Sequence, residues 1–300
     1  MTSFATLPAT AAAFRDRSWE RIAPYYDELL ARPLTQENLA AWLADWTALS
    51  ALVDEVNTLY TIATTVNTAD AEAERGYTAY LDTIQPQALA AEQRLREKLL
   101  ASNLEPPEGF AVPLRKLRAE ASIYREANVP VIGELRKLEM EYEKLAGARM
   151  ALWEGQEIPL PQVYPFVLDP DRGRRERAWR VMAERRAQDI PALTDLWRQM
   201  MTQRRALAAN AGFDSYRDYR WRELFRFDYT PDDAKRFHAA IEEVAVPAAR
   251  QLNERRAAGT GRRDLAPVGS AGEHQWQAAP PALHDHRRVG GADQRDLLAR

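Results

Sequence analysis

The 300-residue chain is long enough for one large domain or two ordinary ones, and its 46% hydrophobic and 28% charged residues are typical of a globular protein rather than a disordered one. Its 41 basic and 44 acidic residues give a net charge of −3, which offers no general reason to expect nucleic acid or another polyanion as a partner. The absence of cysteine excludes disulfides, thiolate catalysis and cysteine-ligated zinc, and it fits a reducing compartment.

The sequence shows no signal for export or for a membrane. Its first residues, MTSFATLPATAAAF, lack the basic flank and the long apolar core of a signal peptide. No run of about 18 apolar residues occurs, so we expect no transmembrane helix and no membrane partner. A cytoplasmic protein is therefore expected.

A long helix over 38–66 is the first element that the apolar pattern predicts. Apolar side chains at three- and four-residue steps form one stripe there, made of Leu39, Trp42, Leu43, Trp46, Leu49, Val53, Val56, Leu59, Tyr60 and Ala63. Thr35 and Asn38 are both suitable residues to cap its start.

Three further helical stretches follow. The first, over 71–102, contains Pro86, which should kink or divide it, and 103–109 (NLEPPEG) then has the composition of a loop. Helices over 113–127 and 131–149 come next, with a Val-Pro pair between them, because proline disfavours helix in the residue before it.

The apolar period changes over 149–162, RMALWEGQEIPLPQ. Short apolar runs lie on both sides of Glu154 and Gly155, which predicts one small β-hairpin near 150–160. No fixed-period repeat and no sustained heptad pattern is present. The patterns together predict a mainly α fold, an antiparallel multi-helix array with that single hairpin.

Two short sequences predict how the later helices begin. In DPDR, Asp169 is the expected cap with Pro170 in the first turn, and helices over 171–189 and 191–210 should follow. In TPDD, Thr230 is the expected cap and the acid three residues later completes a capping box. That last helix should run to about residue 256, with an apolar set of Phe237, Ile241, Val244 and Val246.

An arginine run over 171–186 is compatible with nucleic-acid binding, but its composition favours a solvated helix face. Acidic residues interrupt the run, and unmixed positive charge is what gives affinity for polyanions. Trp179, Val181 and Met182 should supply a buried stripe on the same helix.

Aromatic residues and the one histidine of the helical body are best explained by packing. Trp42, Trp46 and Trp197 lie on apolar helix stripes, which predicts core positions. His238 follows Phe237 directly and is also expected to be packed rather than catalytic.

Paired acidic side chains do not form a metal site in this sequence. Glu139 with Glu143, and Glu242 with Glu243, have no histidine at ligand spacing and are expected to be surface charge. The His-Asp-His sequence at 284–286 has loop-like flanks that give it no scaffold. No glycine-rich phosphate loop and no Ser/His/Asp arrangement can be nominated.

Three motifs occur in a characteristic order within 207–252. The first, NAGFDSYRDY, is represented by Asn210, Gly212, Phe213, Tyr216, Arg217, Asp218 and Tyr219. The second, RFDYTP, spans 226–231, and the third is a Val-Pro pair at 246–247. In this order they resemble the oligoendopeptidase F branch of the thimet oligopeptidase-like zinc metallopeptidases. The resemblance extends back through LWEGQEIPLPQV and DPDRGRRERAWR and covers roughly residues 15–256.

The resemblance implies an almost all-α enzyme that encloses a channel and hydrolyses peptide bonds in short peptides. In that family the two histidines of H-E-x-x-H and a downstream glutamate hold zinc, because histidines four apart project from one helix face and the glutamate takes a proton from the zinc-bound water. This sequence contains no H-E-x-x-H, and none of its four histidines is followed by glutamate. We therefore expect an inactive N-terminal portion with no catalytic residue, no metal ligand and no bound zinc, and with unknown substrate-binding residues.

The resemblance also divides the chain into three parts. Residues 1–200 correspond to the N-terminal helical domain and 201–256 to the beginning of the catalytic domain. The remaining part, 257–300, holds three of the four histidines and lacks apolar periodicity, so we expect a disordered tail. A frameshift near Asp264 would explain this change, because compatible codons read one nucleotide later encode TWRPWDLRVNTNGKPPLRPF, which resembles the family's next segment.

Two other functions stay open. One is a non-catalytic helical module that binds peptides or a partner protein. The other is a nucleic-acid binder built on the arginine run, which the net charge does not favour.

Overall fold

The computed structural model describes residues 4–259, which are helical apart from short connections and one hairpin. The chain divides into two compact units, Met1–Ala148 with Asp189–His238, and Arg149–Gln188 with Ala239–Arg300. The mainly α class and the single hairpin predicted from the sequence are confirmed. No helix in the described part of the chain is long and apolar enough to span a membrane.

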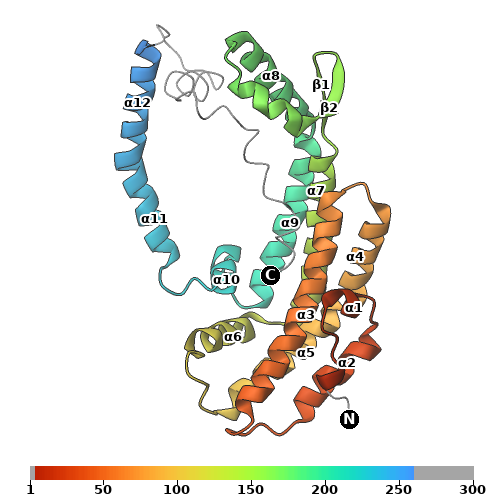
Figure 1. Ribbon diagram of the computed structural model, residues 1–300. Coiled ribbons are helices and arrows are strands. Elements are labelled where there is room, and N and C mark those ends of the chain that lie inside the picture. Colours follow the sequence, from red (N-terminus) through yellow and green to blue (C-terminus); the bar gives the residue numbers. More distant parts are fainter. Residues whose placement is uncertain (1–3, 260–300) are drawn as a thin grey trace, which may run out of the picture. The chain divides into compact units, whose positions relative to one another are not determined.

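The first unit is an array of helices joined mostly by short connections, and Figure 1 shows the longest of them, α3, alongside α4. Its helices are α1 (Ala11–Arg15), α2 (Trp19–Ala31), α3 (Leu39–Val66), α4 (Ala71–Thr83), α5 (Gln85–Ser102), α6 (Ala111–Ile123), α7 (Val129–Gly147), α9 (Ile190–Asn210), α10 (Tyr216–Glu223) and most of α11 (Pro231–Ala240). Short 3₁₀ turns occur at Phe4–Thr6 and Glu126–Asn128.

A large core joins α1 to α5, and the stripe predicted on α3 forms its centre. Trp42 is fully buried, and its indole N–H donates to the carbonyl of Leu29 on α2 at 2.9 Å. The start of α3 differs from the expected cap. Thr35 and Asn38 accept hydrogen bonds from each other's backbone amides, so they form a local turn and neither side chain caps the helix.

The division of the stretch over 71–102 is confirmed. α4 ends at Thr83, and α5 begins at Gln85 with Pro86 in its first turn, where the missing amide hydrogen costs no hydrogen bond. The two helices therefore pack against each other as separate elements.

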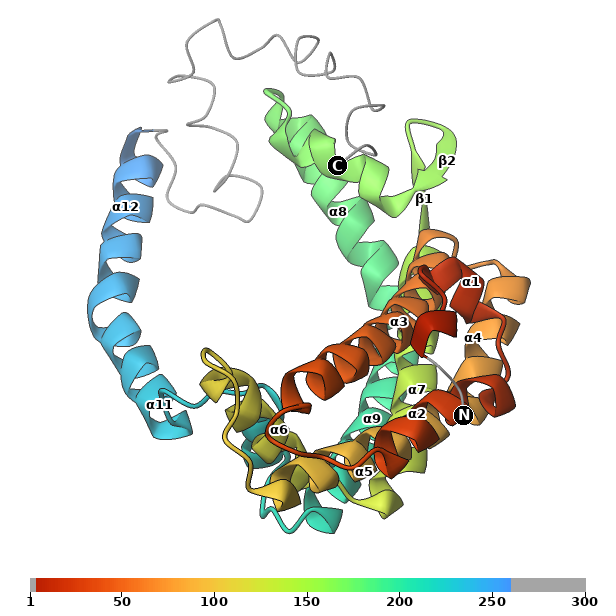
Figure 2. The ribbon, with the colours of Figure 1, turned by 60° about the horizontal axis from the view of Figure 1, so that its bottom comes forward.

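A second core joins α6, α7, α9 and α10, and Figure 2 shows α7 and α9 side by side. Its centre includes a buried polar residue, Asn128, which is 2% exposed. The Asn128 amide donates to the carbonyl of Leu207 at 3.1 Å, and its oxygen accepts from the amide of Asn210 at 2.9 Å. These bonds fix the end of α9 to the start of α7.

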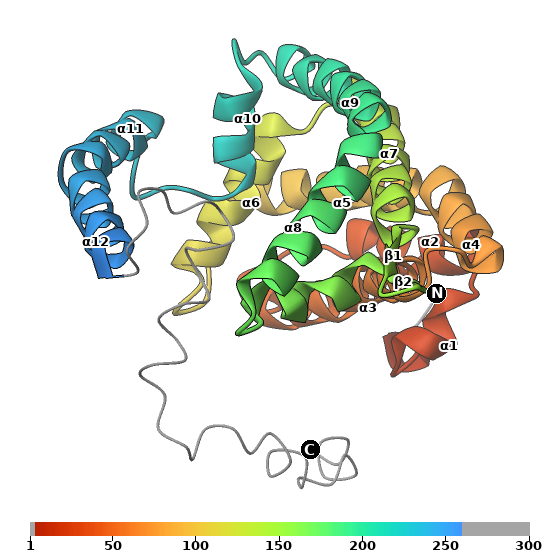
Figure 3. The same ribbon diagram turned by 90° about the horizontal axis from the view of Figure 1, so that it is seen from above.

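The second unit contains the hairpin of β1 (Met150–Trp153) and β2 (Gln156–Pro159), a 3₁₀ segment (Leu160–Leu168) and α8 (Arg172–Gln188), and Figure 3 shows the hairpin beside α8. The strands pair antiparallel, with Ala151 opposite Ile158. Both turn residues have positive φ, 49° at Glu154 and 84° at Gly155, as a two-residue hairpin loop of the favoured hand requires.

The small core of this unit is aromatic and aliphatic. The rings of Trp153 and Phe166 stack with centroids 4.9 Å apart, and Ala178 and Met182 of α8 complete the cluster. The stripe predicted on α8 is correct for Met182 and wrong for Trp179, which is 39% exposed.

The two predicted helix starts had different outcomes. The capping box at α11 is confirmed, because the Asp233 amide donates to the Thr230 hydroxyl oxygen and the Thr230 amide donates to the Asp233 carboxylate at 2.8 Å. At α8 the expected cap was two residues too early. Asp171, not Asp169, accepts from the first-turn amides, the nearest being that of Gly173 at 2.7 Å.

The last described elements follow one another without a loop. α11 passes through a π-helical turn (Ile241–Ala245) into α12 (Val246–Gly259). Phe237 and Val244 are 65% and 70% exposed, so the apolar set predicted on this helix is not buried. Residues 260–300 lie outside the described residues, and with them almost all of the predicted tail and the proposed frameshift.

Candidate functional site

Histidine, cysteine and acidic side chains are the candidate metal ligands of a protein. Within residues 4–259, no group of three or more His, Cys, Asp or Glu side chains is placed to hold a metal ion. His238 is exposed on α11, so the packing expected for it is wrong. The other three histidines, His274, His284 and His286, lie outside the described residues.

The three tryptophans predicted to lie in the core differ in their burial. Trp42 and Trp46 are buried as predicted. Trp197 is 57% exposed, which contradicts its predicted core position. The reason is that one face of α9, including Trp197, borders an open cavity in place of a packed neighbour.

That cavity, the α3–α7–α9 cavity, has a volume of about 590 Å³, within the range of ligand sites. Each of the three helices turns one face toward it, since the lining residues recur at helical spacing on each. The α3 face presents the hydroxyl residues Thr61, Thr64 and Thr65.

The α9 wall of the cavity is apolar, and the α7 wall is charged. Leu193, Trp197 and Met200 line the first of these walls. On the charged α7 wall, Arg136 pairs with Glu139 at 2.7 Å. The Glu139 side chain is 43% exposed, so its charge is paired at the surface. The cavity therefore suits an amphipathic ligand that presents an apolar side to α9 and hydrogen-bonding groups to α3.

The ion pair at the end of the charged wall joins α7 to α4. Lys144 donates to the carboxylate of Glu74 at 2.9 Å, and this hydrogen bond raises the pKa of Lys144. Glu143 lines the same cavity and is exposed, whereas Glu242 and Glu243 lie on the exposed surface as predicted.

A second cavity, the α3–α5–α6 cavity, has a volume of about 640 Å³ and is organised by Glu92. The Glu92 carboxylate accepts from the Tyr26 hydroxyl at 3.0 Å, the Trp46 indole N–H at 2.8 Å and the Ser50 hydroxyl at 2.7 Å. Three neutral donors from α2 and α3 thus hold one charged acceptor on α5. The same arrangement raises the pKa of Tyr26, through its burial first and the charge of Glu92 second.

Other carboxylates border this second cavity. Burial, followed by the charges of Glu92 and Glu120, raises the pKa of Asp54. Arg96 offsets part of that negative charge and pairs with Glu120 at 2.9 Å. The cavity is therefore mildly acidic.

Comparisons with known proteins identify the fold that carries these cavities. Residues 12–106 match the family model described as Peptidase M3 N-terminal domain. No curated protein sequence matches the chain.

Residues 12–106 are therefore similar to the N-terminal domain of M3 peptidases.

Solved structures extend this finding to the fold of nearly the whole chain. A structure of PZ peptidase A with an inhibitor superposes with a TM-score of 0.79 at 21% identity, over 90% of this chain and 48% of that one. Two structures named as oligoendopeptidase F superpose similarly. One has a TM-score of 0.77 at 19% identity, over 92% of this chain and 51% of that one. The other, from Bacillus anthracis, has a TM-score of 0.76 at 18% identity, over 91% and 50%.

The chain thus spans about half the length of the solved structures that it matches. The resemblance inferred from the motifs is confirmed at the level of the M3 N-terminal domain and the fold. The Glu92 arrangement lies entirely within the M3 N-terminal domain, whereas the α3–α7–α9 cavity also uses helices beyond it.

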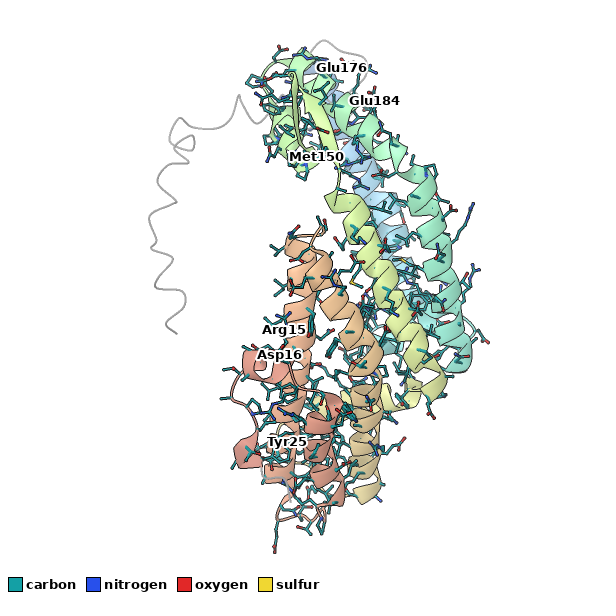
Figure 4. All side chains as sticks on the ribbon, turned by 90° about the vertical axis from the view of Figure 1, so that its right-hand side faces the viewer. Arg15, Asp16, Tyr25, Met150, Glu176 and Glu184 are labelled. Carbon is teal, nitrogen blue, oxygen red and sulfur yellow. The ribbon has the colours of Figure 1, made fainter. Side chains whose placement is uncertain are left out.

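Part of the positive charge of the arginine run on α8 is paired with acidic side chains. Arg174 pairs with Glu154 at 2.9 Å and with Asp169 at 3.0 Å, and Arg180 pairs with Glu176 at 2.8 Å. Figure 4 shows two of the acids that interrupt the run, Glu176 and Glu184, on this helix. The structure therefore supports a mixed-charge helix face.

Sequence reasoning missed the residues that need a three-dimensional partner. Glu92 and Asn128 belong to ordinary helical sequences, and only folding brings their donors to them. Arg175 is 1% exposed and donates to the carbonyl of Asp169 at 2.7 Å, although its neighbours in the run are charged surface residues. No local signal distinguishes Arg175 from those neighbours.

Proposed function

We propose that this chain supplies the N-terminal helical half of an oligoendopeptidase F-like zinc metalloendopeptidase that hydrolyses short peptides. The observation that carries the proposal is the superposition of 90% of the chain on 48% of PZ peptidase A, together with the M3 N-terminal domain at residues 12–106. Hydrolase and protease activity would then belong to the whole enzyme, and the 300-residue chain would have no peptidase activity by itself.

Zinc does not fit the described residues of this chain. His238 is exposed, and within residues 4–259 no group of three or more His, Cys, Asp or Glu side chains is placed to hold a metal ion. The sequence of all 300 residues contains no H-E-x-x-H. We therefore propose that the zinc ligands of the intact enzyme lie outside this chain, and we expect no zinc bound to it.

The α3–α7–α9 cavity is our candidate for a peptide contact surface. An extended peptide presents both backbone hydrogen-bonding groups and side chains, and the cavity has a hydroxyl wall and an apolar wall to receive them. Short peptides are accordingly the proposed partners, and neither nucleic acid nor a membrane is part of the proposal.

The division of the chain stays part of this proposal. Residues 1–200 would be the N-terminal helical domain and 201–256 the beginning of the catalytic domain, with an aberrant tail from 257 caused by a frameshift. The cytoplasmic location is also proposed, and the lack of cysteine supports it.

A second candidate function is a non-catalytic helical module that binds peptides or a protein. The exposed apolar residues of the π-helical turn and of α12, such as Val244 and Leu252, favour it, because they offer a surface to a partner. The DNA downstream of the gene distinguishes the two. An H-E-x-x-H encoded in the shifted frame supports the enzyme, and its absence there and in the unshifted frame supports the module.

The direct test compares the 300-residue chain with a version in which the frame is restored. Zinc content and cleavage of a fluorogenic peptide are measured for both. The proposal expects zinc and cleavage in the restored version alone. A restored version that folds but neither binds zinc nor cleaves would refute it.

A further inference from the structure

The segment between α10 and α11 surrounds a hollow of about 390 Å³, which we name the Arg–aromatic hollow. Three arginines and four aromatic residues make up most of its lining, and Asp218 is the one acid among the lining residues. The arginines are Arg115, Arg222 and Arg226, and the aromatic residues are Phe213, Trp221, Phe227 and Tyr229. It lies wholly within the first unit and uses the RFDY sequence that packing alone does not explain.

The backbone around the hollow is held in an unusual shape. Phe225 has a φ of 54°, a left-handed conformation that is rare for a bulky residue. Its amide donates to the carbonyl of Arg222 at 3.1 Å, which closes a tight turn directly after α10. The indole N–H of Trp221 then donates to the carbonyl of Tyr229 at 2.9 Å and ties the far end of the segment to the helix. Strain of this kind often accompanies a positioned functional site.

Aromatic rings hold two of the guanidinium groups in place. The Arg226 guanidinium carbon lies 4.6 Å from the centre of the Trp221 ring and 6.0 Å from that of Tyr229. The Arg115 guanidinium carbon lies 4.1 Å from the centre of the Phe227 ring. Stacking on a ring fixes the plane of a guanidinium and leaves its N–H groups available at the edge.

Among the residues that the structure describes, a carboxylate comes within ion-pair distance of only one of these three arginines, Arg115. Asp218 accepts from the Ser215 hydroxyl at 2.7 Å and from Arg217 at 3.3 Å, and the bond from Ser215 lowers the pKa of Asp218. Asp228 approaches Arg115 only to 3.8 Å, and its side chain is 93% exposed. Within residues 4–259, neither Arg222 nor Arg226 has a carboxylate at ion-pair distance.

The hollow therefore concentrates positive charge on a chain whose net charge is −3. An oxyanion bound there would meet preoriented N–H donors, and a guanidinium edge matches the two oxygens of a carboxylate. The half-buried rings of Trp221 and Phe227 beside the arginines would receive an apolar or aromatic group attached to the same ligand.

We propose that the Arg–aromatic hollow binds a carboxylate that is attached to an aromatic or apolar group. The carboxylate would lie between Arg222 and Arg226, with its apolar group against Trp221 or Phe227. The proposal does not need the peptidase activity suggested above, because it concerns a small acid and this chain alone. Failure of either proposal leaves the other standing.

Isothermal titration calorimetry on the 300-residue chain tests the proposal. The two ligands are N-acetyl-phenylalanine and its C-terminal amide. The two ligands share the aromatic group and differ in the carboxylate. The acid should bind about tenfold or more tightly than the amide, because charge-assisted hydrogen bonds are lost in the amide. Inorganic phosphate should bind more weakly than the acid, since it has no apolar group.

Variants locate the site. Arg222→Gln and Arg226→Gln should each weaken binding of the acid by about tenfold and leave binding of the amide unchanged. Arg226→Lys should recover only part of the loss, because lysine keeps the charge and lacks the planar fork. Arg198→Gln, at an exposed position on α9, is the matched control and should change nothing.

Four results would overturn the proposal. They are equal binding of acid and amide, binding of neither at millimolar concentration, glutamine variants that behave like the Arg198 control, and phosphate that binds as tightly as the acid. Should a glutamine variant fail to fold by circular dichroism, the comparison of acid with amide on the unaltered chain still decides.

Discussion

Glu92 shows how one side chain can hold three helices together. Its carboxylate on α5 accepts hydrogen bonds from Tyr26 on α2 and from Trp46 and Ser50 on α3. A glutamine at this position could not accept all three hydrogen bonds equally well. Its amide has one acceptor oxygen, and its NH₂ group would face at least one of the three donors.

Glu92→Gln should therefore lower the free energy of unfolding by about 1–3 kcal/mol, the usual range for lost hydrogen bonds to a charged group. Urea denaturation followed by circular dichroism measures the change. Glu55→Gln on the exposed side of α3 is the control and should stay within about 0.5 kcal/mol of the unaltered chain. If the two variants unfold alike, the Glu92 arrangement does not stabilise the fold.

Asp54 should make stability depend on pH in the direction opposite to a typical ion-paired carboxylate. Burial and the nearby charges of Glu92 and Glu120 raise its pKa in the folded state. The folded state then holds the proton to a higher pH than the unfolded state, whose value is about 3.9. Stability is consequently lost as pH rises from that value through the raised pKa.

Asp54→Asn should remove this loss and raise the free energy of unfolding at pH 7. We expect a gain of about 0.5 kcal/mol. It is small because Asp54 keeps contact with solvent at the cavity, although the surrounding protein removes part of the water around its carboxyl. The gain should disappear near pH 3, where the carboxyl is protonated in both states. Denaturation curves at the two pH values check this, and an equal effect at both would show that charge is not the cause. Asp27→Asn on the exposed side of α2 is the control.

At the scale of elements, apolar periodicity and proline positions predicted most of the structure. The stripe on α3 became the centre of the main core, and Pro86 separates α4 from α5 as expected. The errors have local physical causes. The start of α8 shifted because Asp171 could reach the first-turn amides, and Trp197 is exposed because α9 borders a cavity.

The hairpin turn offers a sharp test of an element. Gly155→Ala places a Cβ on a residue with a φ of 84° and should destabilise the hairpin by about 1 kcal/mol. Hydrogen exchange of the hairpin amides should accelerate accordingly.

Gly133→Ala on α7 is the contrasting change. Its new Cβ would lie 3.8 Å from the carbonyl oxygen of Leu81, an ordinary contact, and alanine favours a helix over glycine by about 0.5–1 kcal/mol. That variant should be neutral or more stable. A Gly155 variant with unchanged hairpin exchange would contradict the role given to the positive φ.

At the scale of the whole molecule, the motif order in 207–252 was more informative about function than any single residue. It pointed to a family whose N-terminal domain model matches residues 12–106 and whose solved structures share the fold. The cavities could not be predicted, because they depend on faces of α3, α7 and α9 that are far apart in the sequence. The hydrogen bonds of Glu92 and Asn128 could not be predicted either, because their partners also lie far away in the sequence.

We propose that these residues are the helical half of a metallopeptidase whose zinc ligands lie elsewhere. Zinc content and hydrolysis of a fluorogenic peptide, measured on the purified 300-residue chain, test it most directly. We expect no tightly bound zinc and no hydrolysis above the rate of a buffer blank. Stoichiometric zinc together with peptide cleavage that a chelator abolishes would contradict it.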